Sequence, residues 1–412
     1  MKVKILKGIN QIGGCITQIV SNKGTKIIID FGEDLPDDNR KDKIINPNID
    51  GLTIGKKKYD AVFITHSHGD HIGLINYILD DIDVYVEPIS KQIYTLLATF
   101  TKKNIRFKTK DMYFNQKIVI NNDIVVTPFI VDHSSYNSVM LLIEADGKKV
   151  LHTGDFRNHG FKGKLFEPTL KEIGQVDLII TEGTSLSRGV NEAKTEEQLA
   201  KEALEIFTRY DQVFILQSST NIDRISGFYK ASIKTRKNFI EDLFTANIVL
   251  SLNNDSIPNP KTFKNVYVWI PTRYKKKSWK FKEKYINPLK KYSKQKSYLN
   301  NKYTLMVKTS MIEDIEKLYN KNHITNACLI YSMWEGYKEK AEMNHFFSLI
   351  DNYEIHDIIN LHTSGHADLK TIEMLNQLQA KKVIPIHTTE PEALKNVLNN
   401  VYLAKLNEEI EV

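Results

Sequence analysis

The feature that most constrains this chain is a dense group of metal-binding side chains in residues 63–74, FITHSHGDHIGL. The ligand-type residues in it are His66, His68, Asp70 and His71. Side chains two residues apart in an extended loop point the same way, so the first two histidines can reach one ion. The aspartate and the third histidine begin a helical pattern and turn toward a second point nearby. The spacing therefore predicts a strand-to-helix loop that holds two adjacent metal ions.

The side-chain types narrow the choice of metal and show that the loop is incomplete by itself. Neutral imidazoles and carboxylates suit zinc, with manganese or iron as alternatives, and a catalytic site keeps one position open for water. A pair of ions needs about seven protein ligands, and the loop supplies four. Two further candidates follow apolar runs, where a strand delivers a side chain to the edge of a sheet: His133 in FIVDHSS and Asp155 in VLHTGDF.

Composition and cysteine usage describe the setting of this loop. A chain of 412 residues with 41% hydrophobic content can form a large core, spread over about two or three domains. Cys15 and Cys328 match no metal-ligand or redox spacing, and we expect both to be buried, reduced thiols. No apolar run approaches the roughly 18 residues of a membrane span, and the N-terminus lacks the apolar core of a signal peptide. We expect a cytoplasmic protein with no membrane partner.

The pattern of apolar residues changes along the chain. Short strands separated by Gly and Asn turns dominate residues 2–182, apart from the helix that starts at Asp70. A charged amphipathic helix follows at 192–210, and strands then alternate with helices, which indicates a parallel α/β unit. The last part returns to strand, helix and strand.

A strongly basic stretch lies inside the predicted α/β unit. Residues 273–302 contain twelve Lys or Arg and a single acid, Glu283. The aromatic residues among them are Tyr274, Trp279, Phe281, Tyr285, Tyr292 and Tyr298. Interleaved cations and flat rings suit a phosphate backbone with stackable bases. The alternative is a solvated segment whose aromatic rings pack inward, and both interpretations stay open here.

These landmarks together resemble the metallo-β-lactamase fold, in which an HxHxDH loop, a histidine after a strand and an aspartate in a GD turn hold two metals. Asp30 in IIIDFGE is similar to the early structural aspartate of that fold, which supports the ligand loop. The resemblance extends to the β-CASP nucleases, the group that contains ribonuclease J and the endonuclease subunit of the pre-mRNA cleavage factor. Its landmarks here are TEGT at 181–184, SSTNIDRI at 218–225, SGHA at 364–367 and PIH at 385–387.

The resemblance covers essentially the whole chain and implies a fold. The metallo-β-lactamase domain is an αββα sandwich, an α/β fold, with a parallel α/β β-CASP domain inserted into it. The implied limits are 1–195 for the first part of the metallo-β-lactamase domain, 196–345 for the insertion and 346–412 for the C-terminal part.

The resemblance also implies a ligand set and catalytic residues. The implied ligands are His66, His68 and His133 for one ion, Asp70, His71 and His387 for the other, and Asp155 between them. Glu182 matches the acid of motif A, His366 the histidine of motif B and His387 the histidine of motif C. A histidine at motif C is similar to the RNA-processing branch rather than the DNA-repair branch.

The implied activity is hydrolysis of phosphodiester bonds in single-stranded RNA. Two cations about 3.5 to 4 Å apart lower the pKa of a bridging water and clamp the attacking and leaving oxygens. Besides the ligand Asp70, the implied catalytic residues are His366, which protonates the leaving oxygen or steadies the transition state, and Glu182, which holds it. We expect two divalent ions, Zn²⁺ first and Mn²⁺ as the alternative.

Several residues are predicted to contact substrate. Ser364 and Gly365 resemble the ribonuclease J loop that seats a 5'-terminal phosphate, and Ser332 resembles another phosphate-contacting serine, with a plain strand-to-helix turn as the alternative. In the basic stretch the predicted RNA contacts are Lys275, Lys276 and Lys277.

Two other classes of enzyme compete with an RNA nuclease. A DNA nuclease of the same family is the first alternative, although the motif C histidine argues against it. A lactonase or β-lactamase would share the metal loop but would be shorter and lack the insertion. Few residues follow His387, so we expect none of the C-terminal domain that supports dimerisation in ribonuclease J. A homodimer, and the choice between exonuclease and endonuclease, stay open.

Overall fold

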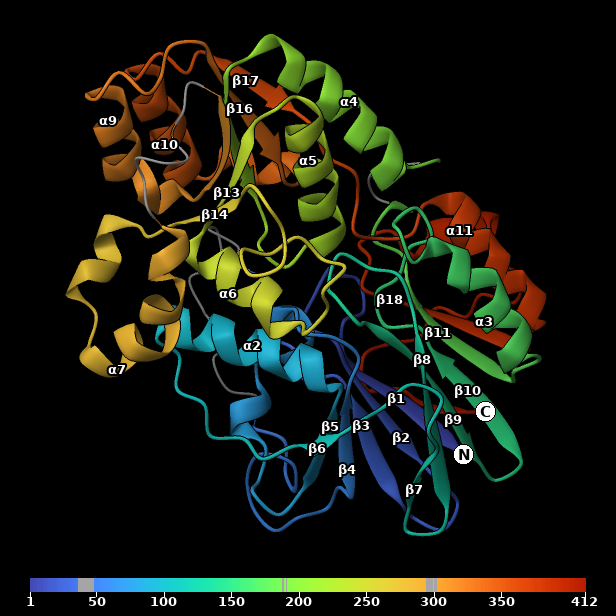
Figure 1. The fold of residues 1–412 in the computed structure, drawn as a ribbon. Helices are drawn as coiled ribbons and strands as arrows, with labels where there is room; N and C mark the ends of the chain where they lie inside the picture. The colour runs from blue at the N-terminus through green and yellow to red at the C-terminus, as the bar shows by residue number, and fades with distance from the viewer. Residues whose placement is uncertain (36–47, 187–188, 190, 294–298, 300–301) are drawn as a thin grey trace. The chain divides into compact units, whose positions relative to one another are not determined.

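The structure is a computed structural model that describes residues 1–35, 48–186, 189, 191–293, 299 and 302–412. The predicted aromatic Tyr298 lies outside these residues. The chain forms two compact units (Figure 1). The first contains Met1–Ala193 and Gly365–Val412, and the second contains Lys194–Ser364.

The first unit contains two sheets. The seven-stranded sheet has the order β19-β1-β2-β3-β4-β5-β6, antiparallel from β19 to β3 and parallel from β3 to β6. Its strands are β1 (Lys2–Lys7), β2 (Ile16–Val20), β3 (Lys26–Ile29), β4 (Ala61–Ile64), β5 (Asp83–Val86), β6 (Lys110–Asp111) and β19 (Glu409–Glu411). The six-stranded sheet has the order β18-β11-β10-β9-β8-β7. Its strands are β7 (Ile118–Ile120), β8 (Ile124–Ile130), β9 (Val139–Ala145), β10 (Lys148–His152), β11 (Leu178–Glu182) and β18 (Lys382–Ile386).

The two sheets pack face to face because their strands carry apolar residues on both faces. Ile27 and Ile29 of β3 join a core cluster that also contains residues of the second sheet, such as Leu141 and Ile180. Ile28 points to the opposite face, as the two-residue period of a strand requires, and joins a separate cluster. Each sheet is thus buried between the other sheet and a layer of helices.

Helices cover the outer faces of both sheets. Those of the first unit are α1 (Gly69–Ile72), α2 (Pro88–Thr101), α3 (Phe166–Ile173) and α11 (Leu369–Glu373). α1 and α2 contribute to the outer cluster of the first sheet, and α3 and α11 to that of the second. The αββα sandwich predicted from the sequence is therefore confirmed (Figure 1).

The second unit is built on a six-stranded parallel sheet of order β14-β13-β15-β12-β16-β17. Its strands are β12 (Gln212–Gln217), β13 (Asn238–Asp242), β14 (Val266–Trp269), β15 (Tyr303–Val307), β16 (Ala327–Ser332) and β17 (Asp357–Asn360). Its longer helices are α4 (Glu196–Arg209), α5 (Ile222–Lys234), α6 (Leu243–Ser251), α9 (Ile312–Tyr319) and α10 (Ala341–Asp351). α9 and α10 pack on one face, and α5 and α6 contact β13. The inserted parallel α/β domain is confirmed.

Short helical turns connect the longer elements. In the first unit they are η1 (Ile75–Tyr77), η2 (Gly163–Leu165), η9 (Met374–Leu378) and η10 (Pro391–Asn396). In the second they are η4 (Thr272–Lys276), α7 (Trp279–Phe281), η5 (Lys282–Ile286), η6 (Asn287–Tyr292), η7 (Thr309–Met311) and η8 (Glu335–Glu339).

The limits of the second unit differ from the predicted insertion. The sequence expectation ended the insertion at residue 345, whereas the compact unit continues to Ser364. The extra length contains β17, which pairs in parallel with β16 and adds an edge strand to the sheet. At the other limit the unit begins at Lys194, two residues before the predicted start.

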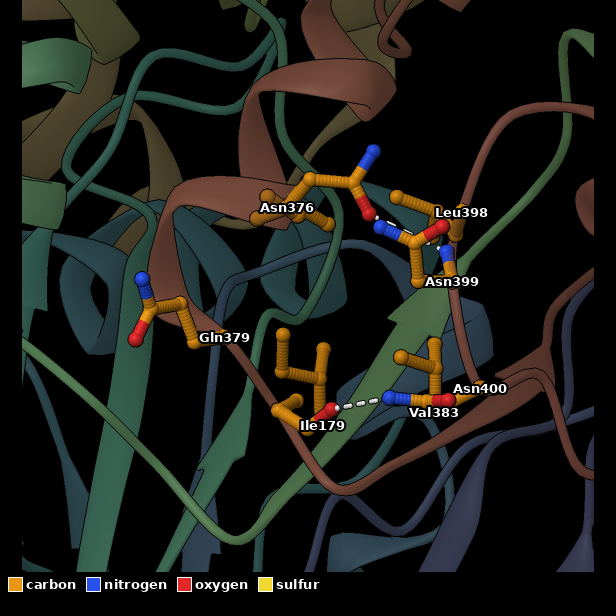
Figure 2. Close-up of a pocket in the computed structure, with 9 residues that line it drawn as sticks. Ile179, Asn376, Gln379, Val383, Leu398, Asn399 and Asn400 are labelled. Carbon is orange, nitrogen blue, oxygen red and sulfur yellow. Dashed lines mark hydrogen bonds between the residues drawn. The ribbon is translucent and has the colours of Figure 1, made fainter.

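Two further expectations concern membranes and cysteines. Within the described residues no helix has the length and apolarity needed to cross a bilayer. Cys15 and Cys328 are buried and unpaired, as expected. A cavity of about 260 Å³ lies beside η9 and β18 (Figure 2). The side-chain amides of two asparagines that line it form hydrogen bonds within the protein. Asn376 accepts a hydrogen bond from the backbone nitrogen of Asn399, and Asn400 donates one to the Ala380 carbonyl.

Candidate metal centre

The predicted ligand loop connects the end of β4 to α1, so it is the strand-to-helix loop expected from its sequence. Asp30, at φ 59° just after β3, fixes the start of the loop. Its carboxylate accepts hydrogen bonds from the backbone nitrogen of Thr65 at 2.7 Å and from the Thr65 hydroxyl at 2.9 Å. Gly32 allows the helix to approach, because a Cβ there would lie 1.6 Å from the carbonyl oxygen of Asp70.

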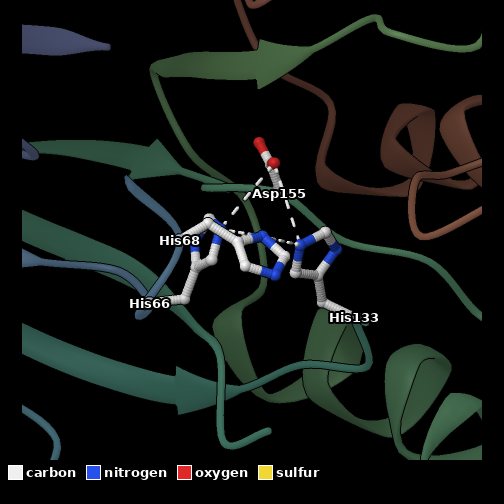
Figure 3. A group of neighbouring side chains, drawn as sticks. All are labelled: His66, His68, His133 and Asp155. Atoms are coloured by element: carbon white, nitrogen blue, oxygen red, sulfur yellow. Dashed lines mark hydrogen bonds and ion pairs between the residues drawn. The ribbon is translucent and has the colours of Figure 1, made fainter. Parts of the chain in front are cut away.

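Four candidate ligands form a first cluster (Figure 3). Nδ1 of His68 lies 3.1 Å from Nε2 of His66 and 3.1 Å from Nε2 of His133. Oδ2 of Asp155 lies 3.9 Å from the first of these Nε2 atoms and 3.8 Å from the second. His133 follows β8 and Asp155 follows β10, so both strand-end candidates reach the loop.

The hydrogen bonds behind the rings indicate which nitrogens face the cluster. The Thr65 hydroxyl donates to Asp30 and therefore accepts from Nδ1 of His66, 3.0 Å away. Nδ1 of His133 donates to the carbonyl of Gly365 at 2.6 Å. Both rings then present an Nε2 lone pair to Nδ1 of His68. Three converging nitrogens of neutral rings are a donor set that a cation satisfies.

A second cluster lies on the other side of Asp155. Nδ1 of His71 donates to Asp30 at 2.7 Å, and its Nε2 lies 3.3 Å from Oδ2 of Asp155. Nε2 of His387 lies 3.1 Å from Oδ2 of Asp70 and 3.8 Å from Oδ2 of Asp155. Oδ1 of Asp155 is buried and has no hydrogen-bond partner among the described residues. Asp155 is therefore shared by both clusters and keeps an oxygen for a cation.

Thr184 sets the orientation of His387, which follows β18 with a left-handed backbone at φ 52°. The Thr184 hydroxyl donates to the carbonyl of His387 at 3.1 Å and accepts from its Nδ1 at 2.7 Å. Nε2 of the ring consequently faces Asp70 and Asp155. Left-handed non-glycine residues held by such contacts are concentrated at functional sites.

Burial and charge set the protonation of the candidate ligands. Burial lowers the pKa of His66 and His133 well below the ordinary value and that of His68 to about 4, so these rings are neutral. Burial alone would raise the pKa of Asp155, but His387 and other histidines hold it well below the ordinary range. The first cluster thus has the neutral imidazoles and ionised carboxylate that bind divalent metals. In the second cluster burial would lower the pKa of His71 and His387, but the nearby carboxylate of Asp155 raises it, so a cation there would displace a proton.

The two predicted catalytic residues lie next to the second cluster. Glu182, at the end of β11, is buried and accepts hydrogen bonds from the backbone nitrogens of Phe156, Thr184 and Ala367. Its Oε2 lies 3.0 Å from Nδ1 of His366, and that nitrogen lies 3.6 Å from Oδ2 of Asp155. Glu182 is held by the backbone and in turn orients the ring of His366.

The residues predicted to contact phosphate have different surroundings in the structure. The Gly365 carbonyl accepts from His133, and a Cβ at Gly365 would lie 2.5 Å from the Ser134 hydroxyl oxygen. Ser364 ends the second unit. Ser332 is buried, contacts the guanidinium of Arg224 and donates its proton to the Leu361 carbonyl. The Ser332 hydroxyl is therefore already paired within the second unit, and its contact with phosphate stays a prediction.

Of the three predicted lysine contacts, Lys275 and Lys276 are exposed. Lys277 is half-buried, and its ammonium lies 4.9 Å from the centre of the Phe281 ring.

Sequence reasoning gave no role to three residues that contact the candidate ligands. The hydroxyls of Thr65 and Thr184 accept hydrogen bonds from ring nitrogens of His66 and His387. Only the position of each threonine inside a quoted motif could have pointed to this role. The Cys15 sulfur lies within 4.8 Å of ligand-type nitrogens of His71 and His387. Burial raises the pKa of Cys15, which keeps it a neutral thiol.

Comparisons with known proteins agree with this geometry. Residues 26–211 match the family model described as the β-lactamase superfamily domain. Ribonuclease J 2 of Streptococcus pyogenes is 24% identical over 247 residues, which are 56% of this chain and 43% of that protein. Ribonuclease J of Helicobacter pylori is 31% identical over 166 residues, 38% of this chain and 23% of the relative.

An RNase J-like protein of Methanocaldococcus jannaschii is 24% identical over 193 residues, 44% of this chain and 42% of the relative. The chain thus spans less than half the length of each of these relatives. A crystal structure of a protein of unknown function from Enterococcus faecalis superposes with a TM-score of 0.80 at 22% identity, covering 99% of both chains. It shares the fold.

Proposed function

We propose that this chain, a member of the metallo-β-lactamase superfamily similar to the β-CASP protein ribonuclease J, is a metal-dependent ribonuclease. Its substrate is single-stranded RNA and its reaction is the hydrolysis of a phosphodiester bond. The observation that carries the proposal is the pair of ligand clusters that share Asp155, with Glu182 and His366 beside them. The names of the relatives support RNA as the substrate class.

The residues of the chain hold the metals and set their positions. His66, His68 and His133 would hold one divalent ion, Asp70, His71 and His387 would hold the other, and Asp155 lies within reach of both sets. When bound, the ion pair supplies a nucleophile at neutral pH and neutralises charge that develops on the attacking and leaving oxygens. Asp30 and Thr184 orient ligand rings, which raises the precision of the site. We propose Zn²⁺ as the ion, with Mn²⁺ as the alternative.

His366 acts on the substrate and Glu182 acts through His366. The Nδ1 proton of the ring points at Glu182, and the ring is 17% exposed at its side chain. This ring donates to the leaving oxygen or to the charged phosphoryl group as the bond breaks. Glu182 is a positioning residue, because its hydrogen bonds reach the ring and the backbone.

The finer activity that we propose is an exonuclease that requires a 5'-phosphate, seated by Ser364 and the backbone of Gly365, working in the cytoplasm. The deciding experiment uses the metal-loaded chain and two single-stranded RNAs of one sequence, with a 5'-monophosphate or a 5'-hydroxyl, each labelled at its 3' end. Progressive release of mononucleotides from the phosphorylated RNA alone supports the exonuclease.

Other outcomes of that experiment separate the alternatives. Discrete internal products from both RNAs indicate an endonuclease. Cleavage of DNA but not of either RNA overturns the RNA assignment, and hydrolysis of a lactone or β-lactam alone overturns the nuclease assignment. His68→Ala abolishes hydrolysis if the proposed centre is responsible, and His356→Ala, which changes an exposed histidine of the second unit, serves as the matched control.

A further inference from the structure

The helical turns of residues 272–292, here called the basic helical segment, present one aromatic ring to solvent. The segment contains η4, α7, η5 and η6, and it packs against α6 and β14 of the second unit. Tyr274, Ile286 and Leu289 are its buried anchors. Trp279, the first residue of α7, has 69% of its surface exposed. A large ring left in water on an anchored segment requires an explanation.

The other rings of the segment are occupied within it. Tyr274 and Phe281 stack with centroids 5.9 Å apart and an interplanar angle of 11°. Phe281 also contacts Tyr285 at 5.1 Å. A cation covers each of these three rings. The Arg273 guanidinium lies 4.8 Å from the centroid of Tyr274, and the ammonium groups of Lys277 and Lys284 lie over Phe281 and Tyr285. For these rings the inward-packing alternative of the sequence analysis holds.

Trp279 differs from those rings. Across the described part of the chain, no aromatic ring stacks on its indole and no cation covers it. Its backbone is nevertheless fixed, because the Ser278 hydroxyl caps α7 by accepting a hydrogen bond from the Phe281 nitrogen at 3.3 Å. The indole is thus a flat face presented at a fixed place.

Exposed cations adjoin this ring in sequence. Lys275, Lys276 and Lys280 are exposed, and none forms an ion pair with an acid of the described residues. Single-stranded nucleic acid combines flat bases with a charged backbone, so it satisfies both kinds of group together. A duplex hides its base faces, and an acidic peptide has no flat ring to place on the indole.

We propose that Trp279 is a stacking platform for one base of single-stranded nucleic acid, with Lys275, Lys276 and Lys280 contacting the adjoining phosphates. This site deepens the proposed function and rests on it for the choice of RNA as the natural ligand. It would favour single strands over duplexes without reading their sequence, since every base has a face that stacks.

The test measures binding to the full-length, metal-loaded chain by fluorescence anisotropy. The probe is a fluorescently labelled oligouridine of about 15 nucleotides, a length in the range that single-strand binding sites span. Its phosphorothioate linkages resist hydrolysis. Trp279→Ala should raise the Kd about tenfold or more, and Trp279→Tyr should recover most of the loss. Trp334→Ala is the matched control, because Trp334 is 42% exposed in the same unit and packs on Tyr337. Its Kd should stay within about twofold of the parent value.

Three results would overturn the proposal. The first is an unchanged Kd for Trp279→Ala, and the second is a loss of affinity on Trp279→Ala that is as large for an oligomer without bases as for oligouridine. The third is that polyglutamate competes for the parent chain as well as oligouridine does. The last would make the segment a general polyanion surface. Binding is read separately from hydrolysis. A tenfold loss with Trp279→Ala in a chain that hydrolyses no RNA therefore supports the platform while the proposed ribonuclease fails. RNA hydrolysis by the parent chain, together with an unchanged Kd for Trp279→Ala, supports the proposed ribonuclease and overturns the stacking platform.

Discussion

The candidate metal centre of the first unit buries and pairs its polar groups, whereas the basic helical segment of the second unit exposes them to water. In the centre, rings of His66, His71, His133 and His387 each have Nδ1 on a partner and Nε2 toward a shared space. In the segment, lysines and one indole face water. In a buried site whose polar groups are all hydrogen-bonded, removing a single atom leaves a partner unpaired and should reduce activity strongly. In an exposed site, removing one lysine should reduce affinity only slightly and in a salt-dependent way.

The largest effect should come from removing a shared ligand. Asp155→Asn keeps the shape of the side chain but removes the charge that both clusters face. Loss of a group that only supports a ligand costs about 10 to 100-fold, so we expect hydrolysis to fall by more than about 100-fold. Bound metal is counted by atomic absorption beside the rate. Asp177→Asn, which changes a carboxylate outside the clusters, is the control, and retained activity in Asp155→Asn would remove Asp155 from the centre.

The next effect separates chemistry from metal binding. His366→Ala should lower kcat by about 100-fold or more while the metal content stays at the parent level, since its ring contacts the centre without belonging to the seven proposed ligands. Glu182→Gln should reproduce part of the loss, because a neutral amide holds the ring less firmly. Equal loss of metal and of rate in His366→Ala would make this histidine a ligand instead.

A smaller effect should follow from loosening one ring. Thr184→Val removes the hydroxyl that accepts from Nδ1 of His387, so the ring can rotate and metal affinity should fall by about 10 to 100-fold. Competition with a fluorescent chelator measures it. The matched change is Thr208→Val on an exposed turn of α4, which should leave the affinity unchanged. An unaltered affinity in Thr184→Val would show that the backbone alone positions the ring.

The smallest effects belong to the basic helical segment. Replacing Lys275, Lys276 and Lys277 together by glutamine should weaken RNA binding several-fold and leave kcat unchanged at saturating RNA. The slope of log affinity against log salt should decrease by about 0.7 for each phosphate that the variant no longer neutralises. Lys277 should contribute least, because its ammonium already lies over Phe281. An unchanged affinity would define these lysines as a solvated face.

Local spacing explains how much the sequence could predict. The HxHxDH loop and Asp30 depend on residues close to a recognisable strand end, and the structure brings them together with His133, Asp155 and His387. The consecutive β-branched residues Ile27, Ile28 and Ile29 lie in the part of the chain predicted to form short strands, and side chains on both faces of that strand proved buried.

Features that depend on distant partners could not be predicted. β17 is an exposed edge strand with only a weak apolar pattern, so the limit at residue 345 left it out. Ser332 looked available until the structure paired it with Arg224 and Leu361, which are far away in sequence. The sequence also could not separate Trp279 from the rings beside it, because exposure depends on what each ring packs against.

The position of β18 in the chain determines when the second candidate ligand set can form. β18 pairs with β11, yet 199 residues lie between the ends of these strands in the chain, Glu182 and Lys382. His387 follows this strand, so the second candidate ligand set is complete only after residues 382–387 have been synthesised and β18 has paired with β11.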